Sequence, residues 1–368
     1  MKAGASSGAR LTPHSPPSKP PRVIRLLVFV VVSVCSLFAQ EQLNPPIAVA
    51  LPPPPPGPSL VAVAQNAAAI RDFEEDPAIT GPMVDALLRT LTGKSDTASA
   101  WRTIAGPGDR FGIKVTCAGG PLFSTRRGVV AAVVAGLQSA GVKTIIVWDK
   151  SAASLRQCGF TPERLGCEVR GIEPPRGWDR TAIFTAPVLG KIIWGDLLFA
   201  EKTAKQYSDP LSAKSYLCTI LSRDVTKFIN LPALSDEPGL GVAGALHSAV
   251  IGNLDNTRRF SSFSEGGASA LPELYADPRI GGKCVLHILD ALLVTFAGGP
   301  SANPQNSTPH GALYASRDPL ALDATALRLM EKWRAAAKLG PIGSKAAWIA
   351  ESTFGHADET MIQLQPVR

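Results

Sequence analysis

The chain has 368 residues, of which 45% are hydrophobic, so it is long and apolar enough to bury a sizeable core. Its net charge is +7, but five of these positive charges lie in residues 1–40, which carry no acidic residue. The remaining residues therefore have a net charge of only +2, which is too small to attract polyanions, and we expect no nucleic-acid partner.

The first 40 residues are typical of an export segment. A basic start is followed by a mostly apolar run of 13 residues, 26–38, which suits a signal peptide and falls short of the ~20 residues that span a bilayer. The cleavage site after Ala39 is weak, because Leu37 stands where a small residue is usual. A cleaved signal peptide and an uncleaved membrane anchor both fit this pattern. We expect a periplasmic protein, or one anchored in the inner membrane and facing the periplasm, that meets the membrane only through this segment.

Residues 41–66 are predicted to be a proline-rich linker. Residues 52–56 are all proline, and such a run favours an extended polyproline conformation that acts as a semi-rigid spacer. The linker would lead into a single α/β domain over residues 67–368.

The domain alternates helical and extended patterns. Periodicity predicts helices over 79–91 and 125–140 and strands over 111–117 and 144–149. A strand–helix–strand unit of this length predicts parallel strands and a right-handed crossover. Further strands are expected at residues 227–231, 284–290 and 311–316, a glycine-rich stretch that leads into a helix at 239–253, and a helix at 319–339. The predicted fold class is therefore α/β, with a mostly parallel sheet and helices on both faces.

Five cysteines follow residue 40, and none forms a C-x-x-C pair, so we expect no iron–sulfur cluster. Cys158 and Cys167 could bridge a short loop in an oxidising compartment, or stay as two reduced thiols.

The segment 119–128 is the sharpest local pattern. Glycines end a predicted strand, Ser124 or Thr125 can cap the next helix, and Arg126 and Arg127 fall in its first turn. Cations there oppose the helix dipole, whereas an anion bound to the free N–H groups would explain both arginines. The alternative is that these arginines pair with carboxylates or point to solvent.

Lys114 and Asp149 belong to the two predicted parallel strands. A lysine within a buried strand needs a partner, so Lys114 is expected to bind a phosphate, to act as an electrophile, or to lie on an edge strand. Asp149 ends its strand at the carboxyl edge, where open α/β sheets bind ligands; the alternative is a helix-capping or turn residue.

Two further acids are candidates. Asp290 is predicted to end the strand 285–290, again at a carboxyl edge, whereas His287 points to the other face and is expected to be a satisfied core histidine. Asp318 and Pro319 suit the start of a helix. Asp323 lies among alanines and leucines of that helix, where an acid should be paired or bind a ligand.

The polar run around 247–259 resembles either a ligand loop or a solvated connection. His247, Asn253 and Asn256 are its candidate ligand-binding residues.

The sequences GIKV at 112–115, STRRGVV at 124–130, FINLP at 228–232, IGNLDNTRRF at 251–260 and DPLALD at 318–323 together resemble the domain-of-unknown-function family DUF362 over about residues 105–335. The resemblance implies an α/β fold and a bacterial origin. It matches the family's strand lysine to Lys114 and its helix-start aspartates to Asp318 and Asp323. The chain has His247 and Ser248 where the family usually has a Lys-Asn pair. Some relatives carry fused iron–sulfur modules, and the cysteine pattern here lacks them.

These patterns predict a cleft at the carboxyl ends of the strands that binds a small anionic ligand. The predicted catalytic residues are Lys114, Asp290 and Asp323, and the predicted ligand-binding residues are Ser124, Thr125, Arg126, Arg127, Asp149, His247, Asn253 and Asn256. A divalent metal could join the acids, since hard oxygen ligands suit magnesium, calcium or manganese. An enzyme acting on a small anionic substrate and a non-catalytic binding protein are both consistent with this pattern.

Overall fold

A computed structural model describes residues 53–173, 177–185, 214–260 and 270–367. The predicted export segment and the first part of the linker lie outside these residues. Within these ranges, no helix is both long and apolar enough to cross a membrane.

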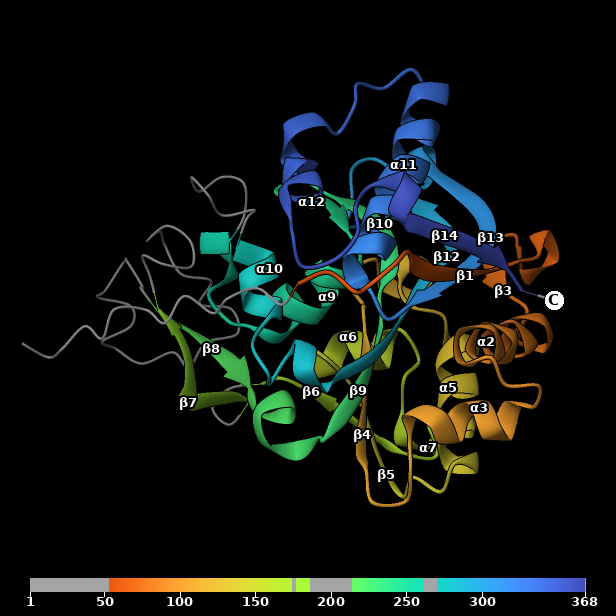
Figure 1. The fold of residues 1–368 in the computed structure, drawn as a ribbon, viewed down its shortest axis with the longest axis vertical. Helices are drawn as coiled ribbons and strands as arrows, with labels where there is room; N and C mark the ends of the chain where they lie inside the picture. The colour runs from red at the N-terminus through yellow and green to blue at the C-terminus, as the bar shows by residue number, and fades with distance from the viewer. Residues whose placement is uncertain (1–52, 174–176, 186–213, 261–269, 368) are drawn as a thin grey trace, which may run out of the picture. The chain divides into compact units, whose positions relative to one another are not determined.

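The fold is built on a twisted central sheet (Figure 1). Its main path runs β14 (Ile362–Pro366), β1 (Ser59–Gln65), β13 (Ser307–Ser316), β12 (Cys284–Thr295), β9 (Lys227–Leu231), β4 (Arg110–Val115), β5 (Thr144–Asp149) and β6 (Glu168–Gly171). Beside this path, β10 (Ala233–Glu237) pairs with β12 and with β11 (Gly241–Ala243). Two small antiparallel pairs are β2 (Ile70–Arg71) with β3 (Glu74–Glu75), and β7 (Trp178–Thr185) with β8 (Lys214–Cys218).

The half of the sheet from β12 to β6 is parallel, whereas β12, β13 and β1 pair antiparallel. The predicted α/β class with a mostly parallel sheet is confirmed. The strands β4 and β5 are parallel, as predicted for the strand–helix–strand unit around α5 (Arg127–Ser139).

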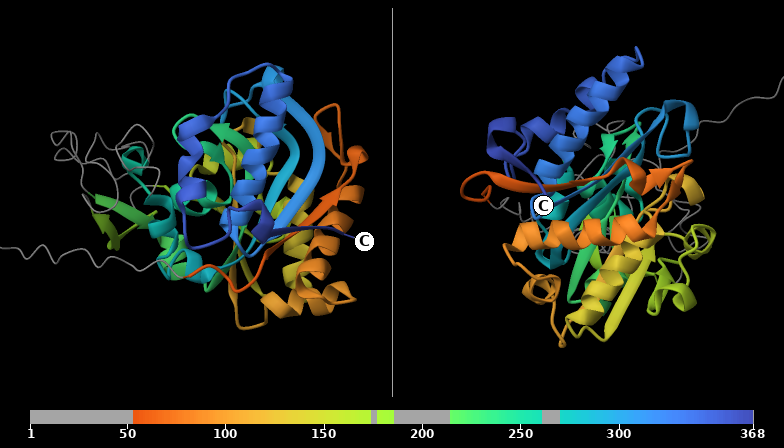
Figure 2. Two further views of the ribbon diagram at one scale, coloured as in Figure 1. Left: turned by 45° about the horizontal axis from the view of Figure 1, so that its top comes forward. Right: turned by 90° about the vertical axis from the view of Figure 1, so that its right-hand side faces the viewer.

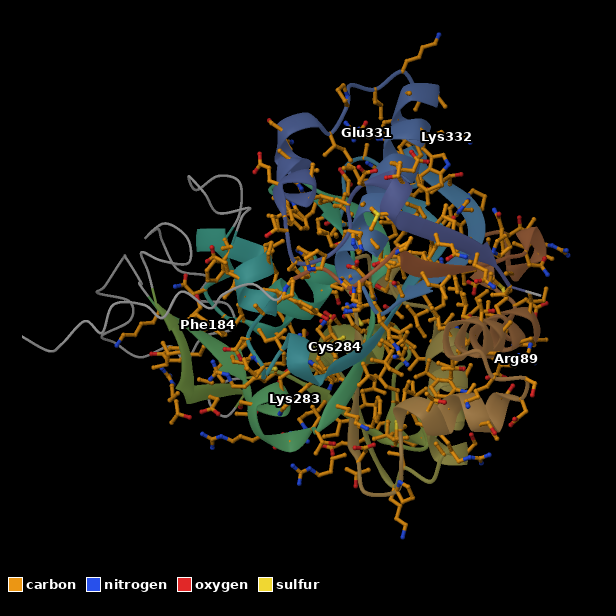
Figure 3. The ribbon with its side chains drawn as sticks, in the orientation of Figure 1. Arg89, Phe184, Lys283, Cys284, Glu331 and Lys332 are labelled. Atoms are coloured by element: carbon orange, nitrogen blue, oxygen red, sulfur yellow. The ribbon has the colours of Figure 1, made fainter. Side chains whose placement is uncertain are left out.

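Helices cover both faces of this sheet (Figure 2). One face packs on α2 (Pro77–Thr92), α3 (Thr97–Ile104) and α5, and the other packs on α9 (Ala245–Val250), α10 (Ala270–Tyr275), α11 (Pro319–Ala336) and α12 (Ala347–Glu351). Short helices are α4 (Gly120–Phe123), α6 (Ala152–Gln157) and α7 (Pro162–Leu165). The polar residues Glu331 and Lys332 lie in the second half of α11, beyond its buried first half (Figure 3).

Alternation along the strands decides which side chains meet. Ile113 of β4 packs in the core on the α5 face, so its neighbour Lys114 points to the α9 face. On β12, Ile288 packs on the α5 face and Leu289 on the α9 face, which returns Asp290 to the α5 face.

Two predicted boundaries need correction. Residues 59–65, which were assigned to the linker, form β1. The mostly apolar sequence SLVAVAQ follows the last proline of the run, and it pairs as a strand between β13 and β14. Asp290 does not end its strand, because β12 continues through a buried apolar run to Thr295.

Candidate functional site

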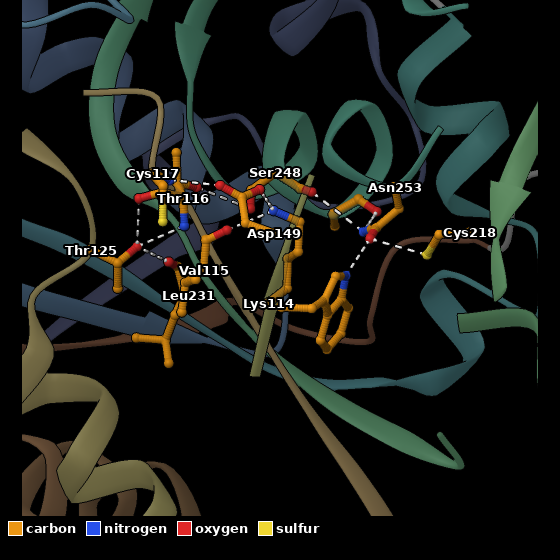
Figure 4. A network of polar contacts seen from close by, with 12 residues as sticks. Lys114, Val115, Thr116, Cys117, Thr125, Asp149, Cys218, Leu231, Ser248 and Asn253 are labelled. Atoms are coloured by element: carbon orange, nitrogen blue, oxygen red, sulfur yellow. Dashed lines mark hydrogen bonds and ion pairs between the residues drawn. The ribbon is translucent and has the colours of Figure 1, made fainter. Parts of the chain in front are cut away.

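A buried ion pair lies where β4 and β5 end (Figure 4). Lys114 is only 1% exposed, and its Nζ donates to Asp149 Oδ1 at 2.8 Å and to the Val115 carbonyl at 2.6 Å. The second oxygen of Asp149 accepts a hydrogen bond from the Cys117 amide at 2.8 Å. The structure thus supplies the partner that a lysine in a buried strand requires, and it brings two predicted site residues together.

A glycine lets the backbone after α9 cover this ammonium group. A Cβ atom at Gly252 would lie 2.9 Å from Lys114 Cε and 3.0 Å from its Nζ. A larger residue at this position would therefore require the end of the Lys114 side chain to shift.

Two hydroxyls and an imidazole adjoin the pair. Thr116 Oγ1 lies 3.5 Å from Ser248 Oγ, between the end of β4 and α9. Burial, followed by the positive charges of Lys150 and Lys114, lowers the pKa of His247 to about 4. The imidazole is therefore neutral at pH 7 and able to accept a proton. We call the group formed by Lys114, Thr116, Asp149, His247 and Ser248 the Lys114 site.

The predicted anion site at the start of α5 is already filled by the chain itself. The Arg126 amide donates to Asp290 Oδ2 at 2.8 Å, and Glu75 accepts from the Gly128 and Val129 amides at 2.8 and 3.1 Å. These two carboxylates take the place that a bound anion would occupy at the backbone.

The side chains of this segment also differ from the prediction. Residue 126 is the N-cap of α5, and its own side chain makes no capping hydrogen bond. Thr125 Oγ1 instead accepts from the Thr116 amide and donates to the Leu231 carbonyl, and Ser124 is buried. The Arg126 guanidinium donates to two backbone carbonyls, whereas Arg127 is exposed.

The structure does not join the predicted acids into one cleft. Asp290 faces α5, opposite Lys114, and burial raises its pKa to about 6. Asp323 caps α9 by accepting from the Ala245 and Leu246 amides at 2.5 and 3.0 Å, and burial raises its pKa to about 7. Each acid is satisfied by a different helix start, and the described part of the chain holds no group of three or more His, Cys, Asp or Glu residues that could bind a metal.

Two predicted ligand-binding amides are used inside the protein. Asn253 accepts from Trp148 Nε1 at 2.8 Å and donates to the Ala249 carbonyl at 2.8 Å. Asn256 has a left-handed φ of 48° and donates to the Lys214 carbonyl at 2.8 Å. Both hold the 247–256 segment in place, which explains a polar run without a ligand.

Sequence reasoning missed several residues. Lys150 and Ser248 each adjoin a predicted residue and Thr116 is two positions from Lys114, so their position in sequence was a usable signal. Arg164 and Glu75 reach the start of α5 only through the tertiary fold. They line a pocket of about 320 Å³ together with Arg127 and Cys158.

Comparison with known proteins gives one family. Residues 209–328 match the DUF362 family, described as a domain of unknown function. The match confirms the resemblance inferred from the sequence. It contains His247, Asp290 and Asp323, whereas Lys114 and Asp149 precede it.

No curated protein matches the chain. Among solved structures, a Thermotoga maritima protein from the Northeast Structural Genomics Consortium aligns with 10% identity and a TM-score of 0.37. The alignment covers 72% of this chain and 61% of that one, so this chain spans less than two thirds of its length.

Proposed function

We propose that this is an exported enzyme that binds a small anionic substrate at the Lys114 site and transfers a proton to or from it. The observation that carries the proposal is a buried ammonium, paired with Asp149, at the carboxyl end of a parallel strand. Ligands of open α/β sheets bind at this edge.

The chemistry follows from the two nitrogen groups. Lys114 supplies positive charge in a low-dielectric setting, and Asp149 and the Val115 carbonyl fix its position. His247 has an unprotonated nitrogen at pH 7 and serves as the general base. The Thr116 and Ser248 hydroxyls can donate to a substrate carboxylate or phosphate oxygen.

The second candidate is a non-catalytic binding protein for the same class of ligand. It is favoured by the pairing of Lys114 with Asp149, because an ammonium held by a carboxylate orients a ligand without needing to react.

Binding is tested by thermal shift and calorimetry with succinate, malonate and inorganic phosphate. Lys150 and Lys143 flank β5 at its carboxyl and amino ends, so they form a matched pair. Lys150→Gln should weaken binding by about fivefold or more, because a charge beside the site contributes about 1 kcal/mol, whereas Lys143→Gln should not. Equal effects, or no binding at all, contradict the proposed site.

Catalysis is tested separately by following deuterium uptake from D₂O into the carbon-bound hydrogens of any acid that binds. His247→Gln should retain binding and abolish the exchange. Binding without exchange in the unmodified protein favours the second candidate. Export is tested by cell fractionation with and without residues 1–40.

A further inference from the structure

Two thiols lie together on the α5 side of the sheet end. Cys117 follows β4 just before α4, and Cys158 is the C-cap of α6; α4 and α6 pack against each other. Both cysteines are buried free thiols of the same core cluster, and each side chain is close enough to the other to shift its pKa. Two cysteines that are 41 positions apart in sequence are thus neighbours in space.

One of these thiols opens onto a cationic pocket. Cys158 lines the pocket of about 320 Å³ at the start of α5, together with Arg126, Arg127 and Arg164. Nη1 of Arg127 and Nη1 of Arg164 lie 2.8 and 2.9 Å from the place that a Cβ atom at Gly159 would occupy. Two guanidinium groups therefore converge at the residue that follows the thiol.

Two acids of the protein offset part of the positive charge in this pocket. Glu75 is bonded to the amides at the start of α5, and Glu74 is a second acid of the lining. Three arginines against two acids leave the pocket with a positive balance, which suits an anionic ligand.

The two thiols differ in acidity. The neighbouring Cys117 thiol, followed by the Ser124 hydroxyl and the charge of Arg127, lowers the pKa of Cys158 to about 7, although burial and Asp149 oppose the shift. The neighbouring Cys158 side chain, together with burial, raises the pKa of Cys117. At neutral pH, Cys158 is a partly ionised nucleophile, and Cys117 is a protonated thiol that stabilises it.

We propose that this pocket is a thiol–disulfide exchange site for small anionic disulfides, in which Cys158 attacks and Cys117 resolves. The site is distinct from the Lys114 site and does not depend on its proposed activity.

The exchange balances in two steps. The Cys158 thiolate attacks one sulfur of the external disulfide, so one protein–ligand S–S bond forms and the external S–S bond breaks, with release of the first thiolate. That thiolate takes up a proton. Cys117 then loses its proton to solvent and attacks Cys158 Sγ, which releases the second ligand thiol. Two protein thiols are oxidised to one disulfide, and one external disulfide is reduced to two thiols.

The reaction is tested with the reduced full-length protein and oxidised glutathione, an anionic disulfide. Peptide mapping by mass spectrometry should find a bond between Cys117 and Cys158. Cys117→Ala should stop at a glutathione adduct on Cys158, and Cys158→Ala should lose the reaction. Cys167→Ala is the control and should leave it unchanged. Modification of Cys167 or Cys284 with none at Cys158 overturns the proposal. Mapping the unmodified protein keeps the test valid where a variant fails to fold.

The charge preference is tested by comparing oxidised glutathione with cystamine, a cationic disulfide. Arg127→Gln with Arg164→Gln should slow the reaction of glutathione by about tenfold and leave cystamine unaffected or faster, because steering by local charge contributes at least that factor. Arg89→Gln, on α2 outside this pocket, is the control. An equal slowing of both reagents overturns the anionic preference.

Discussion

The ion pair between Lys114 and Asp149 predicts a large coupling free energy. At 2.8 Å and an effective dielectric constant of about 20, the Coulomb attraction of the pair is about 6 kcal/mol. Part of this is offset by the cost of removing both charges from water. Replacing one partner leaves the other charge buried, so Lys114→Met should lower the free energy of unfolding by about 3–5 kcal/mol.

A double-mutant cycle isolates the pair. Lys114→Met, Asp149→Leu and the double variant are unfolded in urea at pH 7 and followed by tryptophan fluorescence and circular dichroism. The double variant should cost less than the two single variants together, with a coupling of about 2–3 kcal/mol. Added salt should change it little, since buried charges are poorly screened.

The exposed pair of Arg170 with Glu168 is the control, with side chains 36% and 50% exposed. Its coupling should stay below about 1 kcal/mol. A Lys114–Asp149 coupling as small as this would refute the reasoning, because it would mean that water screens both charges.

Three further predictions concern the helix starts. Burial raises the pKa of Asp323 from 3.8 to about 7, so its contribution to stability is full below pH 4 and is lost as the pH rises through 7. The loss is about 4 kcal/mol, at 1.36 kcal/mol per pKa unit. Urea unfolding across this pH range should show the loss in the wild type but not in Asp323→Asn. Gly244→Ala would place a Cβ atom 2.1 Å from Asp323 Oδ1 and should lower the free energy of unfolding by about 2–3 kcal/mol. Gly81→Ala, where a Cβ atom would have no atom within 4 Å, should raise it by up to about 1 kcal/mol. Urea unfolding of both variants tests this difference. Glu75→Ala removes the acceptor for the Gly128 amide, so the exchange of that amide with D₂O should accelerate and stability should fall by about 1 kcal/mol; unchanged exchange would contradict the capping role.

The sequence predicted those helices and strands whose position depends on the residues within the element itself. Residues 144–149 were predicted as a strand and form β5 with the same bounds, because a short run of β-branched and aromatic residues between turns has few alternatives. The segment 239–253 was predicted as a glycine-rich stretch that leads into a helix, and it holds the strand β11 followed by the short α9. Its glycines allow a strand to pair with β10 before the helix begins. This pairing depends on the tertiary fold, so the local sequence does not indicate it.

The candidate site also has a part that the sequence could predict and a part that depends on the tertiary fold. The pairing of Lys114 with Asp149 was within reach, since two neighbouring parallel strands end at the same edge of the sheet. The capping of α5 by Glu75 spans 53 positions and carries no local signal. Asp290 was wrongly predicted to end its strand, because a charged residue is usual at a strand end. In the structure, the strand β12 is longer and buried, and the Arg126 amide stabilises the Asp290 carboxylate within it.

The position of β1 has a mechanical consequence. It lies between β13, which runs antiparallel to it, and β14, which runs parallel, with four and five residue pairs respectively. A force that pulls on the chain ahead of Ser59, along the strand, must shear both ladders at once instead of opening their hydrogen bonds one at a time. The entry of the chain into the domain is thus held on both sides against such a force, and loss of the residues of β14, 362–366, would leave it paired on one side alone.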